Sequence, residues 1–153
     1  MKTLKGQVLV DFIIEHNIDL DDEVNYITCT PWKLYFDGSI CKDGQGVGIV
    51  VVSPNGAIVE MSCRLEHIRT NNQAKYEALL FGLEILQSMD VQHVLALGDS
   101  LLIVQQVIGV YQCLEGSLNI YLDKCLDIIK QFAKFQIRHI PRQENHKANM
   151  LVQ

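Results

Sequence analysis

Leu34-Tyr35-Phe36-Asp37-Gly38-Ser39-Ile40 is the stretch that decides the fold, because apolar residues alternate along it with the period of two that is typical of a strand. One carboxylate, that of Asp37, stands in the middle of this strand. Burying a carboxylate is costly, so an aspartate kept here indicates a bound cation or a chemical role. The alternative is that Asp37 is a turn residue paired with Ser39. Asp37 is therefore the first candidate for a functional site.

The composition bounds the class of protein. A chain of 153 residues with 48% hydrophobic residues has the size and the core of one globular domain. No signal peptide opens it and no apolar run has the length of a membrane span, so we expect an intracellular protein, cytoplasmic or nuclear. The five cysteines form no C-x-x-C pair, which argues against a disulfide framework and a zinc site and favours reduced thiols. They are Cys29, Cys41, Cys63, Cys113 and Cys125.

The charge distribution limits any role in nucleic-acid binding. The net charge of −5 has the wrong sign for general attraction to phosphates, so such binding requires a local basic patch. Between Asp99 and Phe132 the only cations are Lys124 and Lys130, which gives no basic protrusion. A candidate patch lies near the end of the chain, although a solvated loop and helix start would look the same. It consists of Arg138, His139, Arg142, His146 and Lys147.

Hydrophobic periodicity and turn residues predict the order of the elements. Residues 1–31 are expected to form a leader or tether, and residues 32–153 the folded domain. Turn chemistry at 43–46 and 53–56 separates three strands into an antiparallel meander. Helices then alternate with two strands that are most simply placed parallel to the first, which is an α/β fold with a mixed sheet. The expected strands are 33–39, 47–53, 57–65, 94–97 and 135–140, and the expected helices are 70–89, 101–108, 118–132 and one after Pro141.

A second aspartate stands where function gathers in such sheets, at the end of a strand. Asp99 closes the fourth strand, and if that strand neighbours the first, Asp99 and Asp37 converge on one divalent cation. Hard oxygen ligands suit magnesium. Alternatively, Asp99-Ser100 is only the N-cap of the helix that follows.

Taken together, several motifs resemble the ribonuclease H type 1 family, in the variant found in the polyproteins of plant long-terminal-repeat retrotransposons. The resemblance covers about residues 32 to 153, and the leader around Lys5–Phe12 also looks like the tether that precedes the domain in such polyproteins. It implies a five-stranded mixed sheet in the order 3-2-1-4-5, flanked by helices. The motifs are Phe36-Asp37-Gly38-Ser39, Thr70-Asn71-Asn72, Gly98-Asp99-Ser100 and His139-Ile140-Pro141-Arg142, followed by Asn145 and Ala148.

The resemblance implies a nuclease that cuts the RNA strand of an RNA–DNA hybrid, with four carboxylates holding two Mg²⁺ or Mn²⁺ ions. Asp37 and Asp99 match two of these carboxylates. The other two family positions are Lys75, in the run Ala74–Leu79, and Asn149, in Asn145–Asn149. Asn149 keeps a carbonyl oxygen that can ligate a metal but has no charge, and it can equally be an ordinary helix-start residue. The final helix is expected to be shorter than in the family.

Helical geometry selects Lys75 over Glu77 as the residue that faces the site, because residues two apart point about 200° away from each other. Lys75 shares its face with the apolar stripe that must meet the sheet, whereas Glu77 is expected to be mostly solvated. An ammonium about 4 Å from a divalent ion repels it by on the order of 8 kcal/mol at an effective dielectric constant of about 20. We therefore expect weak metal binding, unless the lysine stem swings outward.

The resemblance also implies roles near the substrate. His139 matches a histidine that assists proton transfer or product release. Alternatively, His139 has only a structural role at the end of its strand. Asn71 and Asn72 are expected to contact the hybrid backbone or minor groove, or to cap their helix. Gly38 and Ser39 are expected to allow a phosphate to approach the first strand, or to form a turn.

Three functions stay open from the sequence. The first is a ribonuclease H-like domain whose catalysis is impaired by Lys75 and Asn149, the second is an active hybrid ribonuclease, and the third is a non-catalytic module that binds nucleic acid or protein. Because cations are few, the isolated domain should bind hybrid weakly. A neighbouring polymerase domain in a polyprotein would be its natural partner.

Overall fold

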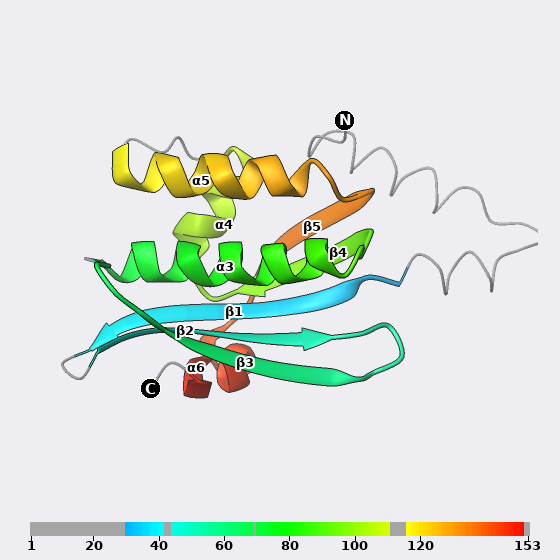
Figure 1. Ribbon diagram of the computed structural model, residues 1–153, viewed down its shortest axis with the longest axis horizontal. Coiled ribbons are helices and arrows are strands. Elements are labelled where there is room, and N and C mark those ends of the chain that lie inside the picture. The colour runs from blue at the N-terminus through cyan, green and yellow to red at the C-terminus, as the bar shows by residue number, and fades with distance from the viewer. Residues whose placement is uncertain (1–29, 42–43, 69, 111–115, 152–153) are drawn as a thin grey trace, which may run out of the picture.

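The computed structural model describes residues 30–41, 44–68, 70–110 and 116–151, and the expected leader lies almost wholly outside these ranges. A five-stranded sheet forms the centre of the molecule (Figure 1), with the strand order β3-β2-β1-β4-β5. This order and the mixed character of the sheet confirm the predicted fold. Within the described ranges, no helix combines the length and the apolar composition needed to cross a membrane.

The first three strands form the predicted antiparallel meander. β1 (Trp32–Cys41) pairs with β2 (Gly44–Val52), and β2 pairs with β3 (Ile58–Leu65). The tight turn between β2 and β3 is closed by a hydrogen bond of 2.9 Å from the Gly56 amide to the Ser53 carbonyl. Gly56 has a φ of +91°, a conformation that favours glycine. Local turn chemistry therefore sets the register that keeps one face of the meander buried.

The two later strands add to the other side of β1, and both pairings are parallel. β4 (His93–Gly98) pairs with β1, and β5 (Lys134–His139) pairs with β4. Parallel strands end at the same edge of a sheet, so β1, β4 and β5 bring their carboxyl ends together. This edge is where the sequence predicts the site.

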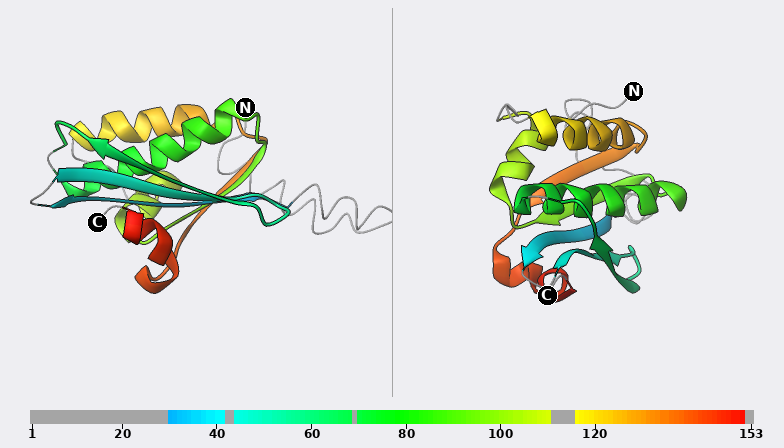
Figure 2. Two further views of the ribbon diagram at one scale, coloured as in Figure 1. Left: turned by 60° about the horizontal axis from the view of Figure 1, so that its bottom comes forward. Right: turned by 60° about the vertical axis from the view of Figure 1, so that its left-hand side comes forward.

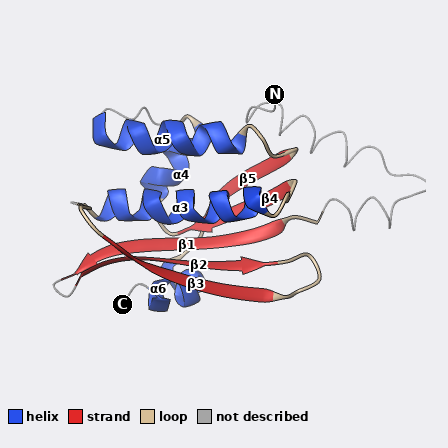
Figure 3. Cartoon of the chain, in the orientation of Figure 1, coloured by secondary structure: helices blue, strands red, loops and turns tan. Residues whose placement is uncertain are grey.

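Helices cover both faces of the sheet (Figures 2 and 3). α3 (Asn71–Ser88) packs on β1 and β2, and α5 (Gly116–Ile129) packs against α3 on the same side. α4 (Leu101–Ile108) connects β4 to this layer. A 3₁₀ turn at Arg142–Asn145 leads into α6 (His146–Leu151), which lies on the opposite face against β2 and β1. The predicted helices are all present, with α5 beginning two residues earlier and ending three residues earlier than expected.

The contact between α3 and β1 is unusually close, and two glycines explain it. A Cβ atom at Gly38 would lie 2.2 Å from the carbonyl oxygen of Ala74, and one at Gly82 would lie 2.5 Å from a methyl carbon of Leu34. Neither position has room for a side chain, so the helix backbone rests almost directly on the strand. This approach brings the first turns of α3 to the carboxyl end of β1.

The core lies between the sheet and the α3–α5 layer. Its largest fully buried side chains include Tyr76 from α3, Phe132 from the turn between α5 and β5, and Phe36 and Leu34 from β1. Of the cysteines, Cys125 is buried in this core as a free thiol and Cys63 is an exposed free thiol. Cys29 and Cys113 lie outside the described residues.

Candidate functional site

Asp37 and Asp99 come together at the carboxyl ends of two neighbouring strands. The parallel register pairs Phe36 of β1 with Gly98 of β4, and each aspartate is the next residue along its chain. The side chains of Asp37 and Asp99 are only 2% and 7% exposed. The predicted cap at Asp99-Ser100 is present and belongs to Ser100, whose hydroxyl accepts the capping bond from the Ile103 amide at 3.3 Å. The structure thus places two buried carboxylates side by side.

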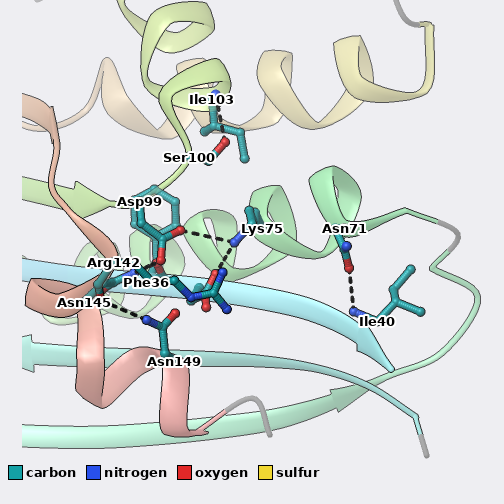
Figure 4. Close-up of polar contacts among 11 residues, drawn as sticks. Phe36, Ile40, Asn71, Lys75, Asp99, Ser100, Ile103, Arg142, Asn145 and Asn149 are labelled. Carbon is teal, nitrogen blue, oxygen red and sulfur yellow. Dashed lines mark hydrogen bonds and ion pairs between the residues drawn. The ribbon is translucent and has the colours of Figure 1, made fainter. Parts of the chain in front are cut away.

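Lys75 lies between these carboxylates, and Figure 4 shows its ammonium beside Asp99. Its Nζ donates hydrogen bonds to Oδ1 of Asp37 and to Oδ1 of Asp99, the latter at 3.2 Å. The Lys75 side chain is 18% exposed, so the ammonium points inward, and the outward swing that sequence reasoning left open is absent here. One ammonium therefore joins β1, β4 and α3 at the place where the resemblance puts metal ions.

The electrostatics of this cluster follow from burial and charge. Burial raises the pKa of Asp37 above its ordinary 3.8, and the hydrogen bond and charge of Lys75 act in the opposite direction. Asp99 adds a smaller upward contribution to the pKa of Asp37, as expected for a neighbouring like charge. Two carboxylates and one ammonium leave one net negative charge. Without Lys75, two like charges would face each other at low exposure.

Asn145 extends the cluster to the far side of the sheet, a role that its place in a sequence motif did not predict. Its Nδ2 donates to the Phe36 carbonyl at 3.0 Å and to Oδ2 of Asp99 at 3.3 Å. Asn145 is 1% exposed. These contacts connect the 3₁₀ turn before α6 to β1 and to the second oxygen of Asp99. A contact across 109 residues of chain leaves no local signal in the sequence.

Asn149, the other substituted family position, turns its amide toward its own segment. The Nδ2 of Asn149 donates to the Arg142 carbonyl at 3.0 Å, and the residue is 8% exposed. Among the described residues, the Oδ1 atoms of Asn149 and Asn145 are buried without a hydrogen-bond partner. Asn149 therefore ties α6 to the preceding turn, while its carbonyl oxygen stays unsatisfied.

The residues present do not fit the divalent-metal pair that the resemblance implies. Across the described ranges, no group of three or more histidine, cysteine, aspartate or glutamate side chains is arranged to hold a metal. Both Oδ1 atoms are engaged by the Lys75 ammonium, and Oδ2 of Asp99 accepts from Asn145. Asp37 also accepts a backbone hydrogen bond from Gly38. A metal would have to displace the ammonium before it reached these oxygens.

Glu77 lies on the other side of α3. Its carboxylate is hydrogen-bonded to the side chain of Tyr121 on α5, and burial followed by the charge of Glu77 raises the pKa of Tyr121. The expectation that Glu77 is mostly solvated is wrong, because it is half-buried between α3 and α5. It remains too far around the helix to act as a substitute ligand.

The remaining candidate residues lie around the cluster with different exposures. His139 ends β5 opposite Gly98 and is exposed, so it is near the site but outside the buried network. Gly38 is buried against Ala74, which indicates close packing of α3 rather than an opening for a phosphate. Ser39, the next residue, is half-buried.

Asn71 and Asn72 begin α3, but neither is its cap. The Thr70 hydroxyl accepts the capping bond from the Gln73 amide at 3.1 Å, so the alternative of Asn71 and Asn72 as caps is wrong. Asn71 is exposed, and its Oδ1 accepts from the Ile40 amide at 2.8 Å, which ties the end of β1 to the start of α3. Asn72, the next residue, is half-buried.

Comparison with known proteins identifies the family of this chain. The profile of the family described as "Reverse transcriptase-like" matches residues 35–153. Ribonuclease HI of Halobacterium salinarum is 32% identical over 120 residues, which are 76% of this chain and 60% of that protein. The chain thus spans about 60% of the length of this curated relative.

Solved structures agree with this comparison. RNase H1 from Halobacterium salinarum NRC-1 aligns with a TM-score of 0.74 and 31% identity, over 79% of this chain and 93% of that one. LC11-RNase H1, solved in complex with an RNA/DNA hybrid, aligns with a TM-score of 0.72 and 32% identity, over 79% and 93% of the two chains.

Proposed function

The chain belongs to the reverse transcriptase-like family of ribonuclease H domains, and from this premise we propose that it binds RNA–DNA hybrids but has lost most of the capacity to cleave them. One observation carries the proposal: the Lys75 ammonium forms ion pairs with both Asp37 and Asp99, the two carboxylates that match metal ligands in the family resemblance. The relatives' hydrolytic chemistry needs divalent ions that activate water and stabilise the leaving oxygen. A cation fixed to the protein supplies neither function.

Hybrid binding is supported by the surface beside the cluster. Arg138, His139, Arg142, His146 and Lys147 are all exposed around the end of β5 and the start of α6. Among these residues, Lys147 forms an ion pair with Glu60 at 3.8 Å, and both side chains of this pair are exposed. Such cations contact phosphates without reading sequence. LC11-RNase H1, which has the same fold, was solved with RNA/DNA hybrid bound.

The proposal includes an origin in a retroelement polyprotein, supported by the reverse transcriptase-like family profile and by the motifs of the sequence. A neighbouring polymerase domain would then supply the substrate grip that the chain lacks. Alone, the domain should bind hybrid weakly and with a shallow salt dependence, because few phosphates are neutralised. Mg²⁺ or Mn²⁺ should bind weakly for the same reason that cleavage is impaired.

The test is a paired binding and cleavage assay on a labelled RNA–DNA hybrid in Mg²⁺ or Mn²⁺. We expect weak binding, measured by fluorescence anisotropy, and no cleavage above background. The reversal Lys75→Glu with Asn149→Asp should raise cleavage by on the order of 100-fold, because it restores ligands for the ions that stabilise the transition state. Asp37→Asn in this double variant serves as the control and should abolish the gain.

Robust cleavage by the unaltered protein that Asp37→Asn abolishes would contradict impaired catalysis and favour the active ribonuclease. Absence of hybrid binding at low salt would contradict the binding role and favour a non-catalytic module with a protein partner. A double variant that binds hybrid but stays inactive would show that Lys75 and Asn149 are not the cause of the loss.

A further inference from the structure

We propose that the Lys75 ammonium is a built-in structural cation, which holds the carboxyl ends of β1 and β4 together and makes the stability of this domain independent of divalent metal. The inference concerns the site on which the proposed function rests and uses the same assignment of Lys75. It predicts a thermodynamic property, however, that holds whether or not the domain binds hybrid. Lys75, which does not fit a site for a pair of metal ions, thus has a structural role of its own.

Burying the two aspartates side by side costs free energy. Asp37 and Asp99 are nearly inaccessible to water, and they stand on adjacent parallel strands one residue beyond a paired position. Two buried like charges destabilise a fold unless a cation compensates them. Within the described ranges, the only side chain that forms an ion pair with either aspartate is Lys75. The ammonium is therefore required for the strand ends to stay charged and close.

The position of the Lys75 ammonium allows it to join two strands. An ammonium has three N–H donors, and Lys75 directs two of them to two carboxylates on different strands. The lysine stem reaches this position because α3 rests on Gly38, where a Cβ atom would lie 2.9 Å from the Lys75 amide nitrogen. Asn145 completes the arrangement from the other face by donating to Asp99 and to the Phe36 carbonyl. Four segments of the chain therefore meet through one cation and one amide.

The surroundings of the two aspartates are unfavourable for a divalent metal ion. Its charge would be opposed by the ammonium, and its oxygen ligands are already hydrogen-bonded. The position of the third acidic ligand is itself the lysine, and the fourth is an amide whose Nδ2 is committed to the Arg142 carbonyl. A divalent ion consequently gains little in the native state over the unfolded state. By linkage, an ion that does not bind the native state does not raise the melting temperature.

The test is thermal unfolding of the full chain in EDTA and in Mn²⁺, with ionic strength matched by NaCl. We expect the same melting temperature for the unaltered protein in both solutions. Lys75→Met, which keeps the length of the stem and removes the charge, should lower the melting temperature by roughly 10 °C, since breaking one side of a buried ion pair leaves uncompensated charge. Lys130→Met removes an exposed ion pair with Asp127 and should change it by less than about 2 °C.

A second variant keeps the test decisive if Lys75→Met does not fold. Lys75→Glu places a third carboxylate in the cluster, so it should be less stable than the unaltered protein in EDTA and should regain stability as Mn²⁺ is added. Adding Asp37→Asn to Lys75→Met should recover part of the lost stability, because it removes one of the uncompensated charges.

Two results would overturn the inference. One is a Mn²⁺-dependent rise in the melting temperature of the unaltered protein, and the other is a Lys75→Met protein as stable as the Lys130→Met control. Neither result depends on hybrid binding or cleavage. A protein that melts as expected but does not bind hybrid would leave the structural cation in place and contradict only the proposed function.

Discussion

Two of the charged side chains on helix α3, those of Lys75 and Glu77, are only two residues apart and face different surroundings. Lys75 points to the sheet edge, where it pairs with Asp37 and Asp99. Glu77 points to α5, where it is hydrogen-bonded to Tyr121. Both side chains are partly buried, so both charges lose hydration. The difference lies in what each charge meets: Lys75 meets opposite charges, and Glu77 meets neutral groups.

Position 75, rather than the presence of a glutamate nearby, therefore decides the chemistry of the site. On the Lys75 side, the register of β1 and β4 sets two buried carboxylates side by side, so that side requires positive charge. On the Glu77 side, the charge only makes the ionisation of its neighbours harder, and it raises the pKa of both Tyr121 and Cys125 after the larger effect of burial. A glutamate two residues further along the helix therefore cannot replace the carboxylate that the family resemblance implies at position 75.

The largest effect on this comparison should come from moving the helix as a whole. Gly38→Ala would place a Cβ atom 2.2 Å from the Ala74 carbonyl oxygen, so α3 must move away from β1 and Lys75 must withdraw from the aspartates. We expect a loss of roughly 3 kcal/mol or more in the free energy of unfolding, measured by urea denaturation. Gly116→Ala is the matched control, because nothing lies within 4 Å of its Cβ position. Equal stability of Gly38→Ala and Gly116→Ala would contradict the close approach of α3.

A smaller effect should appear on the Glu77 side at alkaline pH. Burial, and then the charges of Glu77 and Glu84, raise the pKa of Cys125 from 9.0 to about 12. Between these pH values the native thiol keeps its proton while the unfolded thiol loses it, so the native state becomes less stable as the pH rises. Urea denaturation at pH 9 and above should show this loss, and Cys125→Ala should lose stability less steeply.

The exposed thiol Cys63 supplies the control for this prediction. Cys63→Ala should follow the unaltered protein over the whole alkaline range. If Cys125→Ala and the unaltered protein lose stability in parallel, burial of the Cys125 thiol does not contribute to the pH dependence. Neither cysteine variant should alter the Lys75 cluster, since Cys125 lies in the core between the helices and Cys63 lies on the edge strand β3.

Much of the fold was predictable because its signals are local. Alternation around Asp37, the turn at Ser53–Gly56 and the 3.6 period of α3 each act within a few residues of chain. The same helical period predicts that positions 75 and 77 face different sides of α3. The order of the sheet came from the family resemblance, and the observed topology confirms it.

The site was predictable only in part, because its decisive contacts join distant segments. The inward direction of the Lys75 stem depends on how closely α3 rests on Gly38, and periodicity carries no information on that distance. The bond from Asn145 to the Phe36 carbonyl and the turn of Asn149 toward Arg142 depend on where the last segment meets the sheet. Thr70 caps α3 and Ser100 caps α4. Each stands in a motif beside other polar residues, and the motif alone does not show which of them is the cap.

The central claim is that a lysine ammonium has taken the place of metal between Asp37 and Asp99. Isothermal titration of Mg²⁺ into the unaltered protein tests it most directly, with Glu77→Gln as the control on the opposite side of α3. We predict no micromolar binding to either protein, and clear binding to the Lys75→Glu, Asn149→Asp double variant. Micromolar binding of two ions by the unaltered protein would contradict the claim.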